Sequence, residues 1–267
     1  MTQNRTCENC GTGDLIRFEV PNQTVLWRCP SCDLYQYGTP PSEEAYEEDY
    51  HEDYRQALTR KIRTAHVRLC RVSSVLDCNK PSMLDIGCSI GATVAAAKRR
   101  GWDAHGVDIS RTAVEFCRRE GLDCRQYDGQ TLPYEDQTFD VITSWHVIEH
   151  VTSVSDTLND WFRVLKPGGV MILETPDANC WKARVMGARY RKFWPAEHLY
   201  TFKPNNLAPF VERAGFEVLP SPLIVPPKNV GMTTSVYAVA HQSYLAVSRL
   251  SGFSKAFQIV ARRPKNS

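Results

Sequence analysis

The stretch from Met83 to Ser110, MLDIGCSIGATVAAAKRRGWDAHGVDIS, predicts a strand, a glycine turn, a helix and a second strand. The apolar run 83–86 is long enough for a buried parallel strand, and Gly87 after it frees the backbone to turn sharply. Residues 93–100 are suited to a helix, and residues 102–107 to the next strand. This order is typical of half of a nucleotide-binding α/β sheet.

An acidic residue and the glycine spacing indicate the kind of ligand. Asp108 follows the second strand at its carboxyl end, which is the edge where open α/β sheets bind ligands. A dinucleotide-binding turn would read G-x-G-x-x-G, whereas residues 85–91 read DIGCSIG. The three-glycine fingerprint is absent. The alternative to a cofactor turn is a glycine turn that only packs the helix on the strand.

The turn resembles motif I of class I S-adenosylmethionine (SAM)-dependent methyltransferases, acidic-x-Gly-x-Gly-x-Gly, with Ser89 in place of the middle glycine. The resemblance implies that Asp85 lies near the methionine amino group, and that Asp108 accepts hydrogen bonds from both ribose hydroxyls. Gly87 and Gly91 would admit the cofactor. SAM carries a sulfonium and an ammonium but no phosphate, so carboxylates at strand ends suit it. Further cofactor contacts are expected from Cys88, Ile109 and Trp145.

The segment 128–151, DGQTLPYEDQTFDVITSWHVIEHV, resembles the methyltransferase pattern of an acidic residue, Leu-Pro, Phe-Asp, a strand and Glu-His. By that match Asp128 reaches the adenine amino group and Gly129 gives backbone access. Residues 139–144 would be the fourth strand, after which His146 emerges beside the cofactor sulfur.

Three histidines are candidates for the general base: His146, His150 and His198. In some ubiquinone-type O-methyltransferases two glutamates and a histidine in this region bind a divalent ion. In this chain, which reads H-x-x-E-H over 146–150, the first of those positions resembles His146 rather than a glutamate, followed by Glu149 and His150. That motif still offers metal ligands. The alternative is a Glu-His that packs and hydrogen-bonds at the start of a helix. The second Glu-His, at Glu197, would lie against the active-site mouth, as in similar enzymes.

Two C-x2-C units separated by eighteen residues predict a structural four-thiolate zinc site. The expected ligands are Cys7, Cys10, Cys29 and Cys32. Residues 15–20 and 24–27 can form a hairpin between the two pairs. Such a ribbon is too small to build its own core, so the metal would supply folding energy. A redox pair or disulfides are the alternatives. The other six cysteines, including Cys88, are assigned no chemistry.

The expected domains are a zinc ribbon at 1–40, a helical cap and linker at 41–80, and a SAM-binding domain at 81–267 with insertions at about 177–203 and 228–255. The cap would hold Tyr46, Tyr50 and Tyr54, spaced by four residues on one helical face, either packing or lying over the cofactor pocket. A helix is expected at 55–78.

The fold class is α/β, a Rossmann-like seven-stranded sheet in the order 3-2-1-4-5-7-6 with strand 7 antiparallel, as the resemblance implies. The remaining strands are expected at 123–127, 170–174, 216–225 and 256–262. The remaining helices are expected at 111–120, 161–165 and 204–214, with a turn at 166–169 and one helix within 228–255.

The whole pattern most resembles the zinc-ribbon methyltransferases of polysaccharide and natural-product sugar pathways. It implies methylation of a sugar or related small-molecule hydroxyl, with a nucleotide-linked sugar as one possible acceptor. The alternatives are an RNA base methyltransferase and a SAM-binding protein without turnover that uses the ribbon to contact proteins. The 32 basic and 30 acidic side chains argue against binding to a long polyanion, although residues 182–192 form a local basic cluster. With no apolar run of about 20 residues and no signal peptide, a cytoplasmic protein is expected.

Overall fold

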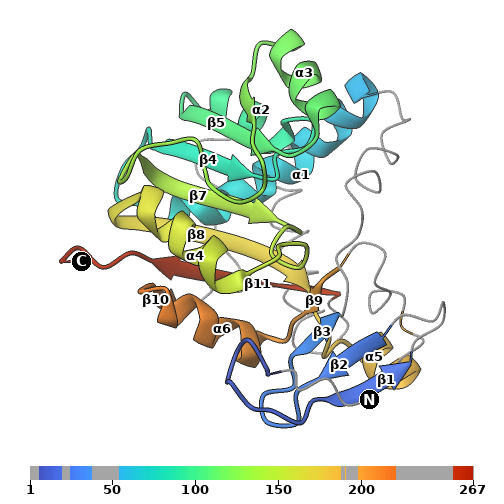
Figure 1. Cartoon of the computed structure of the whole chain (residues 1–267). Coiled ribbons are helices and arrows are strands. Elements are labelled where there is room, and N and C mark those ends of the chain that lie inside the picture. The colour runs from blue at the N-terminus through green and yellow to red at the C-terminus, as the bar shows by residue number, and fades with distance from the viewer. Residues whose placement is uncertain are drawn as a thin grey trace.

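The computed structural model describes residues 6–19, 25–37, 54–187, 190, 198–220 and 255–266. Within them the larger sheet has seven strands in the order β10-β11-β8-β7-β4-β5-β6 (Figure 1). The strands are β4 (Ser82–Ile86), β5 (Asp103–Asp108), β6 (Asp123–Gln126), β7 (Phe139–Trp145), β8 (Leu165–Pro176), β10 (Glu217–Leu219) and β11 (Ala256–Arg262). Counted from β4, this is the predicted order 3-2-1-4-5-7-6. β11 runs antiparallel to both of its neighbours, which confirms the predicted fold class.

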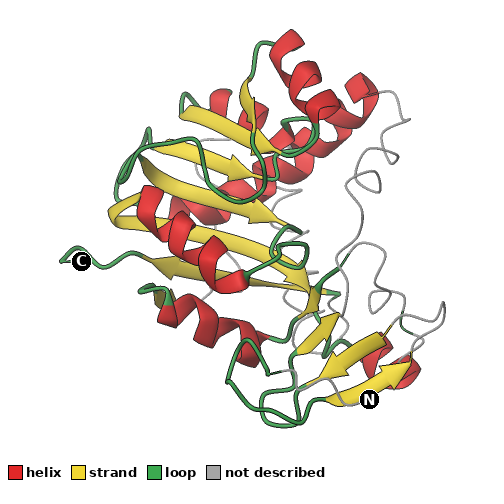
Figure 2. Ribbon diagram, viewed as in Figure 1, coloured by secondary structure: helices red, strands yellow, loops and turns green. Residues whose placement is uncertain are grey.

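Helices cover both faces of this sheet (Figure 2). They are α1 (Tyr54–Ser74), α2 (Ala92–Lys98) and α3 (Arg111–Arg119) on one face, and α4 (Val154–Val164) and α6 (Pro204–Arg213) on the other. Neighbouring residues of β4 show the division. Met83 packs in the same cluster as Leu69 of α1, whereas Leu84 packs in the cluster that contains Leu158 of α4. Because side chains alternate along a strand, β4 is buried on both faces.

Several boundaries differ from the prediction, among them the end of the helix expected at 55–78, which is α1 and ends at Ser74. The helix expected at 161–165 is the end of α4, which begins at Val154 after Ser153, whose hydroxyl accepts the N–H of Asp156 at 3.2 Å. The turn expected at 166–169 falls inside the bounds of β8 and still bends the chain there, because Gly168 has a left-handed φ of 80° and the register of β7 with β8 is irregular between Leu165 and Val170. Gly168 donates its N–H to the carbonyl of Arg263 at 2.8 Å, so the bend is held against the chain beyond β11.

A second, four-stranded sheet is formed by β1 (Ile16–Glu19), β2 (Val25–Arg28), β3 (Tyr35–Tyr37) and β9 (Tyr200–Thr201). The β1–β2 hairpin is the one expected between the paired cysteines. The pairing of β3 with β9 was not predicted. β9 comes from the expected insertion 177–203, which also contains the short helix α5 (Trp181–Met186). The N-terminal ribbon therefore shares its sheet with the larger domain, as Figure 1 shows at the end of the sheet near β9.

The ribbon is also joined to the larger domain by side chains. Leu34 belongs to the same apolar cluster as Phe202 and Leu207. The Glu8 carboxylate accepts a hydrogen bond from the N–H of Val154, at the start of α4, at 3.0 Å, and another from the hydroxyl of Tyr200.

Several expectations lie outside the described residues. They concern Tyr46, Tyr50, Glu197, the basic residues 189, 191 and 192, nearly all of the 228–255 insertion, and the end of the strand predicted at 216–225. None of the helices in the described ranges has the length and apolar composition that crossing a bilayer requires.

Candidate active site

The glycine turn after β4 is constrained by the packing of the chain itself. Gly87 and Gly91 have left-handed φ angles of 70° and 76°. A Cβ atom on Gly87 would lie 2.2 Å from Cγ2 of Val147, and one on Gly91 would lie 2.6 Å from Cδ1 of Leu122. Ser89, at the position of the middle glycine, also has a positive φ of 48°. The turn thus needs its two glycines to fold, and Val147 places the residues after β7 directly against it.

Asp108 is held at the end of β5 by two backbone donors. Its side-chain Oδ2 accepts the N–H of Ser89 at 2.7 Å, and Oδ1 accepts the N–H of Ser110 at 2.9 Å. The residue is 7% exposed, and burial raises the pKa of its carboxyl despite these hydrogen bonds. Each carboxylate oxygen has a further lone pair, which is what a pair of ribose hydroxyls requires.

Asp85 is fully buried beneath the turn. Its Oδ1 accepts the hydroxyl of Thr143 at 2.6 Å, and burial raises the pKa of its carboxyl to about 7. An ammonium group placed beside it would stabilise the ionised form. Two nearby buried polar atoms, Oγ of Ser144 and Nε1 of Trp145, have no hydrogen-bond partner among the described residues. Such orphaned atoms fit a site that is completed by a ligand.

Asp128 lies on the exposed loop between β6 and β7. Its Oδ1 accepts the N–H groups of Gln130 and Thr131 at 2.8 and 3.2 Å, and these bonds lower the pKa of its carboxyl. A Cβ atom on Gly129 would lie 3.4 Å from Cγ2 of Ile109. Two of the expected cofactor residues are therefore neighbours in space.

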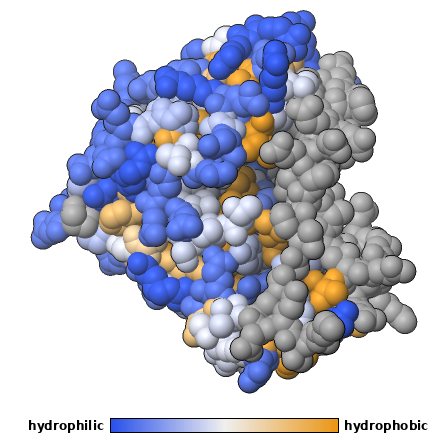
Figure 3. Space-filling model, in the orientation of Figure 1, coloured by the Kyte–Doolittle hydropathy of each residue, from blue (hydrophilic) through white to orange (hydrophobic). Residues whose placement is uncertain are grey.

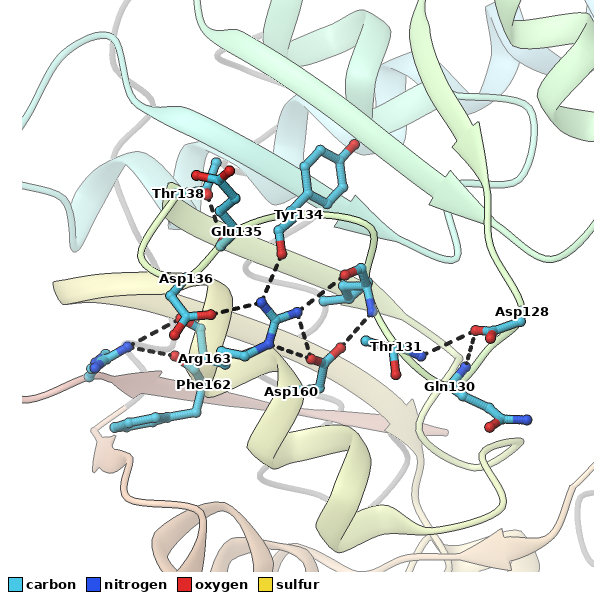
Figure 4. A network of polar contacts seen from close by, with 12 residues as sticks. Asp128, Gln130, Thr131, Tyr134, Glu135, Asp136, Thr138, Asp160, Phe162 and Arg163 are labelled. Atoms are coloured by element: carbon cyan, nitrogen blue, oxygen red, sulfur yellow. Dashed lines mark hydrogen bonds and ion pairs between the residues drawn. The ribbon is translucent and has the colours of Figure 1, made fainter.

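Arg163 anchors the same loop from α4 (Figure 4). Its Nη1 donates to the carbonyl of Tyr134 at 2.8 Å and to Asp136 at 2.9 Å. Asp160, one turn earlier on α4, accepts the N–H of Leu132 at 2.7 Å. Because the guanidinium has donors in a fixed plane, this network sets the path of the loop that carries Asp128.

His146 lies between two carboxylates at the end of β7. Its Nδ1 is 3.3 Å from Oε1 of Glu149, and its Nε2 is 3.4 Å from Oε1 of Glu174. Burial alone would lower the pKa of this half-exposed ring, but the two carboxylates raise it to about 9. At neutral pH the ring is therefore an imidazolium, which donates protons but does not accept them.

Glu174 and Arg68 were not singled out from the sequence. Nη2 of Arg68 donates to Oε1 of Glu174 at 2.6 Å, and its guanidinium lies 4.2 Å from the centre of the Trp145 ring. Burial would raise the pKa of Glu174, but His146 and Arg68 lower it to about 2. An acidic residue at the carboxyl end of the fifth parallel strand was the signal that could have identified Glu174.

A second acid–histidine group, formed by Glu149, His150 and His198, shares Glu149 with the group around His146. Glu149 is 1% exposed, and its Oε2 accepts the hydroxyl of Thr175 at 2.8 Å. The rings of His150 and His198 are 4.8 Å apart in an edge-to-face arrangement. One ligating atom from each of Glu149, His150 and His198 lies within 4.8 Å of the others. The structure thus brings together two of the candidate bases. A metal-capable set includes His198 rather than His146.

The four cysteines of the ribbon converge on one point. Sγ of Cys7 is 3.5 Å from Sγ of Cys32, Sγ of Cys10 is 3.5 Å from Sγ of Cys29, and all four lie within 4.8 Å of one another. In a tetrahedral zinc site with Zn–S distances of about 2.3 Å the sulfurs are about 3.8 Å apart. The residues present fit such an ion.

The strand order, with the glycine turn and the buried acid at the end of β5, defines a SAM-dependent methyltransferase fold. Solved structures agree. A SAM-dependent methyltransferase from Thermotoga maritima matches 78% of this chain and 92% of its own with a TM-score of 0.52 and 20% identity. One from Mesorhizobium loti matches 74% and 98% with a TM-score of 0.55 and 14% identity. The methyltransferase domain family matches residues 46–221, more than half of the chain, and the chain belongs to that family.

Several curated relatives share one name. The ubiquinone biosynthesis O-methyltransferase of Xanthomonas oryzae pv. oryzae is 31% identical over 165 residues, which are 57% of this chain and 69% of that protein. The protein of that name from Bartonella tribocorum is 28% identical over 159 residues, 55% and 64% of the two chains. The chain spans about half to two thirds of the length of the curated relatives that match it first.

Proposed function

We propose that this chain transfers the methyl group of SAM to a hydroxyl oxygen of a small molecule, and that the acceptor is a sugar. The observation that carries the proposal is the contact between the glycine turn after β4 (residues 87–91, here called the cofactor turn) and the segment after β7 (residues 146–150, here called the acid–histidine turn). Val147 lies against Gly87, and the residues on either side of it supply His146, Glu149 and His150. A proton-accepting group therefore stands next to the place where a methyl donor would bind.

Asp85, Asp108 and Asp128 would hold the cofactor at its ammonium group, its ribose and its adenine. When bound, SAM supplies a methyl group on a positively charged sulfur. The fit rests on the two lone pairs that Asp108 keeps, on the buried carboxyl of Asp85 and on the orphaned polar atoms beside it. Positioning of the acceptor in this site would supply much of the rate.

The base would be His150 or His198. An alcohol must lose its proton as its oxygen bonds to the methyl carbon, so a neutral imidazole is required. His146 is an imidazolium between Glu149 and Glu174 and suits a role in positioning. His150 is partly exposed, whereas His198 is 5% exposed, so His150 is the ring more open to an acceptor. Glu149 would stabilise the ring that becomes charged.

A sugar acceptor is supported by the near balance of charge and by the basic residues Lys182 and Arg184 of α5, which could pair with one or two phosphates of a nucleotide-linked sugar. The names of the curated relatives favour a second candidate, a ring hydroxyl of the kind that ubiquinone biosynthesis implies. Both acceptors present a hydroxyl oxygen to the same base.

We also propose that residues 1–40 form a structural zinc ribbon. With four thiolates around the ion no position would remain open for catalysis. The ion would instead hold the two cysteine turns next to β3, which pairs with β9, the strand that follows His198. This proposal is supported by the spacing of the four sulfurs.

A methylation screen tests the function. Purified protein would be incubated with SAM labelled in its methyl group and with nucleotide-sugars, free sugars, catechol-type phenols or bulk RNA, and the labelled product identified by mass spectrometry. We expect label in a sugar hydroxyl, and much less of it with the Asp108→Ala variant when SAM is kept below its dissociation constant for that variant. Label in phenols alone would move the acceptor to the second candidate. Label in RNA alone, with steep loss between low and moderate salt, would reject both.

A further inference from the structure

Three cysteines that the proposed reaction does not use meet beneath the cofactor turn. They are Cys88 in the turn itself, Cys117 on α3 and Cys124 on β6, and their sulfur atoms all lie within 4.8 Å of one another. All three are buried, with exposures of 4%, 0% and 1%. The three positions come from different elements, so the fold rather than local sequence brings the thiols together.

The neighbouring strand leaves space for these sulfurs. Gly106 of β5 lies beside Cys124 in the sheet. A Cβ atom on Gly106 would lie 2.8 Å from Sγ of Cys88 and 2.9 Å from Sγ of Cys124. A Cβ atom on Gly91 would lie 3.0 Å from Sγ of Cys117. Both glycines are thus needed for the three thiols to occupy their places.

The thiols are linked to the residue that holds Asp108. Sγ of Cys117 donates to the carbonyl of Ser89 at 3.3 Å, and the N–H of Ser89 donates to Asp108 at 2.7 Å. Cys88 is bonded through its own N–H to the carbonyl of Val107 at 2.9 Å. A change in the distance between Cys88 and Cys117 would therefore move Ser89 and loosen its bond to Asp108.

We propose that Cys88 and Cys117 are a peroxide-sensitive thiol pair, and that the disulfide between them disables the cofactor turn. Hydrogen peroxide oxidises the Cys117 thiolate to a sulfenic acid and is reduced to hydroxide. The Cys88 thiol then forms the S–S bond and releases water, so that overall two thiols and one peroxide give one disulfide and two waters. Hydrogen bonds from Cys124 and Cys88 lower the pKa of Cys117 to about 5, which favours its thiolate, and the hydrogen bond from Sγ of Cys117 to Ser89 exists only while the thiol keeps its proton. Cys124 is the donor to that thiolate.

The bond requires movement. A disulfide has an S–S distance of about 2.05 Å, so the turn and α3 must approach each other. Because Ser89 lies next to Cys88, the approach changes the site that Asp108 and Ser89 share. SAM bound across the turn would oppose this movement and protect the thiols. The effect on SAM rests on the proposed function, whereas the formation of the disulfide does not.

The test uses the full chain with Cys78→Ser as background. The substitution is needed because the tryptic peptide 72–98 contains both Cys78, which is exposed, and Cys88, so that a cross-link could not be assigned to one of them. Cys117 and Cys124 lie in separate peptides, 112–118 and 120–125. After treatment with hydrogen peroxide we expect peptides 72–98 and 112–118 to be joined. The dissociation constant for SAM should rise at least tenfold, and a thiol reductant should reverse both changes. SAM present during treatment should slow the joining.

Cys88→Ser in the same background should resist peroxide in both measurements. The pair is rejected if peptides 112–118 and 120–125 are joined instead, or if none of the three peptides is modified under conditions that oxidise Cys78 in the wild-type chain. A joined Cys88–Cys117 pair with unchanged SAM affinity rejects its effect on the turn. If the reduced protein does not bind SAM while the disulfide forms, the proposed function fails and the thiol pair stands.

Discussion

The backbone carbonyl of Glu149 accepts a hydrogen bond of 2.7 Å from the N–H of Leu199, the residue that follows His198. The N–H of Tyr200 donates to the same carbonyl at 3.1 Å. On its other side, the carbonyl of Leu199 accepts the N–H of Tyr37, at the end of β3, at 3.0 Å. The segment that carries His198 is therefore fixed between the acid–histidine turn and the ribbon.

This arrangement predicts that the ribbon supports catalysis. In the Glu8→Gln variant the carboxylate that Tyr200 and Val154 share is replaced by an amide, so β9 should lose part of its anchor. We expect kcat to fall about threefold to tenfold, with SAM affinity unchanged, because the cofactor residues lie on other strands. Steady-state kinetics and calorimetry measure the two quantities. Asp14→Asn, at an exposed acidic residue of the same ribbon, is the matched control.

Replacement of Asp108 should weaken the binding of SAM. Loss of a charged hydrogen-bond acceptor costs about 1.5 to 3 kcal/mol, so Asp108→Ala should raise the dissociation constant for SAM by about tenfold to more than a hundredfold. Asp103→Ala, at an exposed carboxylate on the same strand, should leave it unchanged. Titration calorimetry of each variant with SAM and with NAD measures these affinities and tests whether Asp108 binds SAM. Tight binding of NAD, or equal SAM affinity in the two variants, would contradict the assignment.

The three histidines should differ in their effect on turnover. We expect His150→Ala or His198→Ala to lower kcat by a factor of about 100 or more, in line with the contribution of a general base. SAM affinity should be retained. His105→Ala, at a ring that pairs with Asp103 and Asp123 away from this cluster, is the control. Full activity in both the His150 and the His198 variants would contradict the assignment of either histidine as the general base.

The pH dependence of stability should report the charge on His146. Its pKa is about 9 in the folded chain, against an ordinary value of 6.5, so its contribution is complete below about pH 6.5 and is lost as the pH rises through 9. Because the ring is half exposed, solvent screening reduces the effect to about 1 kcal/mol. Denaturant unfolding between pH 6.5 and 9.5 should show this loss in the wild type. It should be absent in His146→Asn, since Asn tolerates the left-handed backbone of this position, where φ is 61°.

One zinc ion per chain is expected from elemental analysis of protein purified without added metal. Cys29→Ser should lose the ion and lower the melting temperature, because the ribbon depends on the metal for much of its folding energy. Cys78→Ser, at an exposed cysteine outside the ribbon, should keep the zinc ion and the melting temperature of the wild type. A folded ribbon that contains no metal would refute the zinc site.

Much of the fold was predictable because the residues of β4, β5 and β7 form short apolar runs, each followed by a glycine or a polar residue at the same edge of the sheet. Asp108 and His146 follow that rule, whereas the role of Asp85, inside the first run, was expected from the resemblance to the methyltransferase turn. The start of α4 was missed because residues 154–160 are mostly polar, with Leu158 and Val154 as their buried contacts. The hydrogen bond between Gly168 and Arg263 was missed because the two residues are far apart in the sequence.

Within the site, local sequence predicted the residues but not their partners. His146 and Glu149 are close in the chain, and their ion pair agrees with the H-x-x-E-H motif. Glu174 and Arg68 reach His146 and Trp145 from β8 and α1, and no spacing rule joins those segments. The meeting of His150 with His198 likewise depends on β9, whose two residues were not predicted to form a strand.

The pairing of β3 with β9 also bears on how the molecule is made. Tyr37 and Thr201 meet across 164 positions of sequence, so the ribbon leaves the ribosome long before the strand that covers its edge. Until then β3 presents unpaired backbone groups of the kind that invite pairing with other chains. A ribbon expressed alone would keep that open edge, and a methyltransferase domain expressed without the ribbon would expose β9 in turn. The ribbon and the methyltransferase domain are therefore not independent modules. Exchange of ribbons between such enzymes should succeed only when the segment around residues 198–203 is exchanged with them.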